Sequence, residues 1–198
     1  MALYVALLRG VNVGGKNLIK MPALKVSFEA GGFEGVATYI QSGNVLFRAS
    51  GSGSALELRI ERMLSKAFGY RASVLLRSHA QMRATVEGAP KGFGGDAAYL
   101  YDVAFLKEPL TARTALKQVP TREGVDEVYA GRGVLYLSRL RSRATQSRMN
   151  KIASLPIYQR MTAHPSPSLP AGVARSASGI RVSAAADKGH DRHLTRPA

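Results

Sequence analysis

The chain has 198 residues and a formal net charge of +15, with 28 Lys and Arg against 13 Asp and Glu and with no cysteine. Without cysteine, a thiol nucleophile, a disulfide, a thiolate-held zinc ion and an iron–sulfur cluster are all excluded. The length suits one domain or two small ones, and 45% apolar residues suffice for a hydrophobic core. The positive charge favours anionic partners.

No segment approaches the ~20 apolar residues that span a bilayer. The N-terminal apolar run is shorter than a secretory core and has no basic leader before it. We therefore expect a cytoplasmic protein without a membrane partner.

Residues 1–78 predict the order strand, helix, strand, strand, helix, strand. The first strand is continuously apolar, Pro22 suits a first helical turn, and Ser54 with Glu57 has the spacing of a capping box at the second helix. This order is the ferredoxin-like (βαββαβ) unit. The expected elements are strands at 3–9, 36–40, 45–48 and 72–76, with helices at 22–30 and 54–67.

The order is repeated after a bridging helix and loop at 79–97. The segments YVALLR at 4–9 and DVAFLK at 102–107 are alike, which indicates a tandem architecture. Residues 98–163 then form a second ferredoxin-like half, and the fold class is α+β. The expected elements are strands at 102–106, 127–130, 134–138 and 158–162, with helices at 112–117 and 144–153.

Composition changes at His164. Residues 164–198 hold four of the nine prolines and three of the four histidines, and they have no aromatic residue. Their apolar residues follow neither a helical nor a strand period. We predict a disordered C-terminal tail there.

Three stretches of the chain, at 4–17, 38–45 and 147–151, resemble the bacterial family called domain of unknown function 1697. The resemblance covers roughly residues 1–163. It implies tandem ferredoxin-like halves and no activity, because that of the family is unassigned. Members of the family continue with an Arg-Asn-Trp-Asn-Thr motif and a closing helix, whereas this chain reads AHPSPS from Ala163. We hypothesise that the tail is divergent or an out-of-frame translation.

A glycine-rich loop, Gly10–Asn17, follows the first strand. Its G-x-x-x-x-G-K spacing fits a P-loop, but Asn17 stands where the magnesium-binding Ser or Thr is needed, so a nucleoside triphosphate site is not expected. Its backbone N–H groups, with nearby Arg and Lys side chains, still suit an anion.

The predicted hairpin at 41–44 lies near that loop, because a right-handed crossover makes the first two strands parallel. We therefore predict a small anionic ligand on this rim of the sheet. The alternative is that the glycines only provide positive φ and the amide side chains only tie the turns together. The predicted ligand-binding residues are Arg9, Asn12, Gly14, Gly15, Lys16, Asn17, Gln41, Ser42 and Asn44.

A second basic feature runs from Arg139 to Arg160 without an acidic residue. Such a run could neutralise phosphates of a nucleic acid, or it could be a solvated face. The residues of this alternative site are Arg139, Arg141, Arg143, Arg148 and Lys151.

Enzyme chemistry has little support in the sequence. His79 is the only histidine before the tail, and Asp126-Glu127 is the only adjacent acidic pair. We predict no cofactor and no metal site, and catalytic residues stay unassigned. An enzyme acting on the same rim is the third hypothesis, and the oligomeric state is left open.

Overall fold

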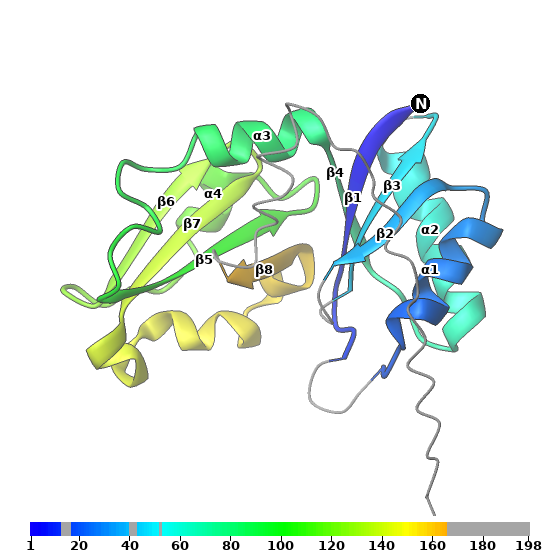
Figure 1. Ribbon diagram of the computed structural model, residues 1–198. Coiled ribbons are helices and arrows are strands. Elements are labelled where there is room, and N and C mark those ends of the chain that lie inside the picture. Colours follow the sequence, from blue (N-terminus) through cyan, green and yellow to red (C-terminus); the bar gives the residue numbers. More distant parts are fainter. Residues whose placement is uncertain (13–16, 40–42, 52, 166–198) are drawn as a thin grey trace, which may run out of the picture.

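The computed structural model describes residues 1–12, 17–39, 43–51 and 53–165, and Figure 1 shows its course. It is a mixed α+β protein with two four-stranded antiparallel sheets, as the predicted fold class requires. Within the described ranges, no helix is both long and apolar enough to cross a membrane. The cytoplasmic location stays a prediction. The predicted start of the tail at His164 is wrong by two residues, because His164 and Pro165 belong to the last strand (Met161–Pro165) and pair with a neighbouring strand. The rest of the predicted tail, from residue 166 onward, lies outside the described residues.

The first sheet has the strand order β2-β3-β1-β4, and two helices cover the face that points away from the second sheet (Figure 1). In the first helix Pro22 occupies the first turn, where its missing N–H costs nothing, and Leu24 and Phe28 are buried against the sheet. The elements are β1 (Ala2–Leu8), α1 (Met21–Ala30), β2 (Glu34–Tyr39), β3 (Asn44–Ala49), α2 (Gly53–Phe68) and β4 (Val74–Ser78).

The β1 strand is buried on both faces. Ala6 and Leu8 belong to the core beneath the helices, whereas Val5 and Leu7 pack with Phe105 in a core between the two sheets. A strand covered on both sides needs apolar residues at every position rather than at every second one. This explains the continuous apolar run at the start of the sequence.

The second sheet has the order β6-β7-β5-β8, the same arrangement as in the first. Corresponding hydrogen bonds end the first strand of each half: the Leu8 N–H donates to the Gly43 carbonyl (3.2 Å), and the Leu106 N–H donates to the Gly133 carbonyl (3.0 Å). The elements are α3 (His79–Glu87), β5 (Tyr99–Leu106), α4 (Ala112–Leu116), β6 (Asp126–Gly131), β7 (Val134–Leu140), η1 (Arg141–Gln146), η2 (Arg148–Ser154), η3 (Pro156–Arg160) and β8 (Met161–Pro165).

The helix expected at 144–153 is wrong, because three short 3₁₀ helices take its place. Ser147 is extended and its hydroxyl caps the Met149 N–H, which starts a new turn there. Leu155 is extended too, as a residue before proline prefers, so the next turn begins at Pro156. The last strand therefore begins at Met161 rather than at Tyr158.

The capping box expected at Ser54 is also wrong. α2 begins at Gly53, so Ser54 lies inside the helix. Glu57 and Glu61 accept hydrogen bonds from the N–H groups of Leu76 and Val74, each at 2.8 Å. β4 is an edge strand with outward N–H groups that need acceptors, and the carboxylates of α2 satisfy them.

Candidate functional site

The base of the glycine-rich loop is closed by two asparagines. Asn12 and Asn17 both have positive φ, 55° and 49°, which asparagine tolerates better than most residues. The Asn12 amide accepts from the Ile19 N–H (2.8 Å) and donates to the Ile19 carbonyl (3.0 Å). The Asn17 amide donates to the Gly10 carbonyl at 2.9 Å. These two side chains therefore anchor the loop through backbone groups.

The loop meets the hairpin before β3, as predicted for the same end of the sheet. Gly43 has φ +80°, and a Cβ there would lie 3.1 Å from the Leu8 Cβ and 3.4 Å from the Val11 Cβ. Asn44, at the start of β3, is only 1% exposed. The remaining predicted rim residues, Gly14, Gly15, Lys16, Gln41 and Ser42, lie outside the described residues.

Arg9 joins this rim to the second half of the chain. Its Nη1 donates to Oε1 of Gln159 at 2.7 Å, and its guanidinium lies 4.7 Å from the centre of the Tyr158 ring. Neither Tyr158 nor Gln159 was among the predicted site residues. No local pattern indicates them, because the internal repeat places the segment before the fourth strand beside the end of the first strand of the same half, whereas Arg9 reaches across to the other half.

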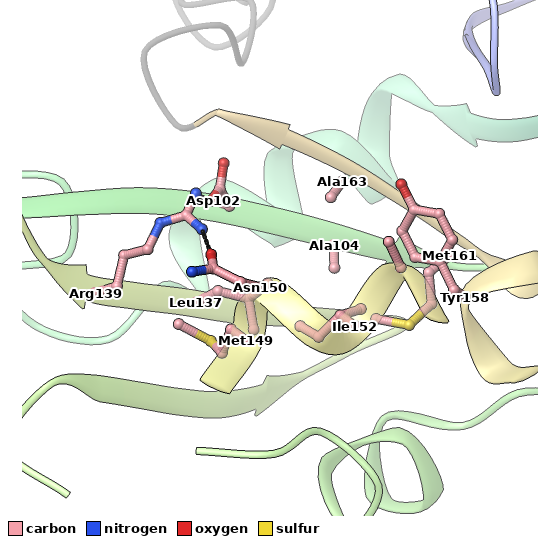
Figure 2. Close-up of a pocket in the computed structure, with 11 residues that line it drawn as sticks. Asp102, Ala104, Leu137, Arg139, Met149, Asn150, Ile152, Tyr158, Met161 and Ala163 are labelled. Carbon is pink, nitrogen blue, oxygen red and sulfur yellow. Dashed lines mark hydrogen bonds and ion pairs between the residues drawn. The ribbon is translucent and has the colours of Figure 1, made fainter. Parts of the chain in front are cut away.

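A pocket of about 300 Å³ lies between the second sheet and the 3₁₀ helices (Figure 2). Its walls are mostly apolar, and Ala104, Leu137 and Met161 are almost fully buried. Three polar side chains, Asp102, Arg139 and Asn150, lie together on one side. The remaining lining residues are Met149, Ile152, Ala153, Tyr158 and Ala163.

The polar side of the pocket is built on an ion pair between adjacent strands. Arg139 on β7 donates through Nη2 to Asp102 on β5 at 2.8 Å and through Nη1 to Asn150 on η2 at 3.3 Å. Burial raises the pKa of the Asp102 carboxyl, and the charge of Arg139 opposes that rise. In the sequence, the only indication of this ion pair is a carboxylate within the apolar strand at 101–106. Which residue pairs with that carboxylate depends on strand register, which the sequence does not show.

The basic stretch is more engaged with the protein than its sequence indicates. The stretch itself contains no acidic residue, but Asp102 on the neighbouring strand pairs with Arg139 at 2.8 Å. Arg141 donates to the Ala97 carbonyl at 3.1 Å, and Arg143 donates to Gln146 at 3.2 Å. Arg148 and Lys151 are exposed. A nucleic-acid interface here stays a prediction.

Asp126 of the acidic pair holds backbone groups in place, and His79 lies at the start of a helix. Asp126 is buried, and its Oδ2 accepts from the N–H groups of Arg122 and Arg148, both at 2.9 Å. His79 begins α3, and Ser78 provides the cap. Across the described ranges, no three His, Asp or Glu side chains gather where they could hold a metal ion.

The protein is therefore a two-sheet α+β protein. It has a polar rim at the Gly10–Asn17 loop, and a pocket in its second half that is lined by apolar side chains and by an ion pair. The chain belongs to the family described as protein of unknown function (DUF1697), whose profile matches residues 1–136. The resembling stretch at 147–151 lies beyond that match. A search of curated proteins finds no significant match.

A solved structure of similar fold is the conserved bacterial protein SP0830 from Streptococcus pneumoniae. The two chains share 24% identity with a TM-score of 0.77, and the alignment covers 88% of this chain and 97% of that one. At this identity the likeness establishes the fold alone.

Proposed function

We propose that the protein binds a small anionic molecule at the rim where the Gly10–Asn17 loop meets the hairpin before β3. The observation that carries the proposal is the closed base of the loop. Hydrogen bonds from Asn12 and Asn17 fix both ends of a segment that reads VGGK. Glycine-rich segments expose backbone N–H groups to anions, and fixing the ends of a loop lowers the entropy cost of ordering it on a ligand.

Charge on the rim supports the same ligand class. The two groups that contact the Arg9 guanidinium in the described part are the Gln159 amide oxygen and the Tyr158 ring, and both are uncharged. The positive charge of Arg9 is therefore not cancelled by these contacts and can attract an anion. Lys16 and Lys20 add two further positive charges in the sequence.

We also infer that each half is a ferredoxin-like unit. Support comes from the shared strand order in the two sheets and from the equivalent hydrogen bonds that end β1 and β5. The second half departs from the unit where 3₁₀ helices replace its second helix. In this arrangement the loops after β1 and β5 are equivalent, but only the first is rich in glycine.

The test is a titration with inorganic phosphate, pyrophosphate and citrate, followed by calorimetry and by thermal unfolding. Lys16→Ala should weaken binding without lowering the unfolding temperature. Lys25→Ala is the matched control, because Lys25 is an exposed lysine on α1 paired with Glu29 at 3.7 Å. Equal binding by the wild type and Lys16→Ala, or no binding of any of the three anions, would contradict the proposal.

A parallel titration with a short RNA at several salt concentrations separates the nucleic-acid alternative. A steep salt dependence that is reduced in Arg141→Ala with Arg148→Ala would favour that alternative. No binding at low salt would remove it.

A further inference from the structure

We propose that the pocket in the second half binds a small zwitterion with an apolar side chain, of the class of a free apolar α-amino acid. This site is separate from the rim and goes beyond the proposed function. In the described part of the chain the two adjoin at Tyr158, whose ring contacts Arg9 and which also lines the pocket.

The shape and walls of the pocket set the size and polarity of the ligand. Its volume of about 300 Å³ lies at the lower end of the ~300–1,000 Å³ that is usual for ligand pockets, which favours a small ligand. Figure 2 shows Ala104, Ile152 and Met161 on the side opposite the polar cluster. A ligand that fills this space therefore gains most from an apolar body of four to six carbon atoms, by rough count.

The polar side of the pocket sets the head group. Asp102 and Arg139 place a negative and a positive charge 2.8 Å apart, so a ligand with a single charge meets attraction and repulsion at nearly the same distance. An ammonium and a carboxylate on one carbon atom match both charges, the ammonium facing Asp102 and the carboxylate facing Arg139. Adjacent opposite charges in the ligand are therefore favoured over a lone anion or cation.

The hydrogen-bonding capacity of the pair is only partly used. A guanidinium carries five N–H donors. In the described part of the chain, Nη2 of Arg139 donates to Asp102, and Nη1 donates to Asn150 over a long distance of 3.3 Å. The Asn150 amide nitrogen is held by the Ala144 carbonyl at 3.0 Å, which keeps its oxygen turned to Arg139. Arg139 thus has donors left for a carboxylate, and its neighbours hold it in place.

Both members of the ion pair have lost part of their hydration. Their side chains are only 27% and 21% exposed, and the mutual attraction of such a pair is offset in part by that loss. The raised pKa of the Asp102 carboxyl reports the same cost, because burial outweighs the attraction of Arg139 there. A ligand ammonium would offset that cost by adding a second positive partner.

The experiment uses the full chain and four matched probes in calorimetric and NMR titrations. L-Leucine carries both charges and the apolar body, isocaproate lacks the ammonium, isoamylamine lacks the carboxylate, and glycine lacks the apolar body. L-Leucine should bind most tightly, and each of the other three should bind about tenfold more weakly or worse, since each loses a charge-assisted contact or the buried body. Equal affinity for isocaproate, isoamylamine or glycine, or no binding of L-leucine, would overturn the proposal.

Variants locate the site. Ala163 lines the pocket from β8 and is exposed, so Ala163→Phe should fill the pocket and weaken L-leucine binding by about tenfold. Ala130→Phe, at an exposed position of β6 that does not line the pocket, is the matched control and should bind L-leucine as the wild type does. If Ala163→Phe fails to fold, Ala153→Phe on η2 fills the same space. Unchanged binding in a folded pocket-filling variant refutes the assignment.

Discussion

Lys107 joins the two halves of the molecule through a half-buried cluster of charges. Its Nζ lies 2.5 Å from a Glu61 carboxylate oxygen and 3.5 Å from a Glu57 oxygen, and it donates to the Val74 carbonyl at 2.9 Å. Both carboxylates belong to α2, which covers the edge of the first sheet, whereas Lys107 follows β5 of the second. The substitution Lys107→Met retains the apolar stem and removes the charge.

The expected cost follows from the burial of the three side chains. The side chains of Lys107, Glu57 and Glu61 are 25%, 16% and 19% exposed. Their burial is intermediate between that of an exposed ion pair, which is worth about 0–1 kcal/mol, and that of a fully buried ion pair, whose breaking costs about 3–5 kcal/mol. We expect Lys107→Met to lower the free energy of unfolding by about 2 kcal/mol. In a chain of this size that corresponds to a drop of about 6 °C in the unfolding temperature.

A double-mutant cycle measured by urea unfolding tests the reasoning. Glu61→Gln keeps an oxygen for the Val74 N–H. In the wild-type background it removes the nearer of the two carboxylate partners of Lys107 and should destabilise by about 1 kcal/mol. In the Lys107→Met background it removes repulsion from Glu57 and should stabilise. If Glu61→Gln has the same effect in both backgrounds, within about 0.3 kcal/mol, the charges are not coupled and the argument fails.

Three further substitutions test single features. Burial raises the pKa of Tyr70 to about 12, and its buried hydroxyl has no acceptor within the described ranges. Tyr70→Phe should therefore leave the free energy of unfolding unchanged or raise it by up to about 1 kcal/mol. Gly43→Ala should cost about 1–2 kcal/mol, because φ is +80° and the new Cβ would lie 3.1 Å from that of Leu8. For Asp102 the folded-state pKa is raised above 3.8, so the wild type should lose stability relative to Asp102→Asn as the pH rises through that raised value.

Each of these has a clear contrary result. A loss above about 1 kcal/mol in Tyr70→Phe would mean that the hydroxyl is hydrogen-bonded. A neutral Gly43→Ala would show that the loop and hairpin separate readily. A wild-type stability that rises against Asp102→Asn over the same range of pH would show that Arg139 outweighs burial at that carboxylate.

The order of the elements could be predicted from the sequence because it depends on local patterns. The continuous apolar run of β1 and the similar segment of β5 predicted the strands, and Pro22 and the glycines after Phe28 bounded α1. The meeting of the Gly10–Asn17 loop with the hairpin followed from the handedness of crossovers. These features need only the periodicity and the backbone preferences of neighbouring residues.

The contacts that give the candidate sites their chemistry were decided by tertiary structure. Asp102 and Arg139 are 37 positions apart and meet diagonally across β5 and β7. Arg9 donates a hydrogen bond to Gln159, which lies 150 positions away in the sequence. A shift of one residue in strand register would turn either strand residue to the opposite face, and no local pattern specifies that register. The sequence by itself therefore determined most of the elements and their order, and the helix expected at 144–153 is the exception. The packing of the two sheets decided which charges face each other and where the pocket lies.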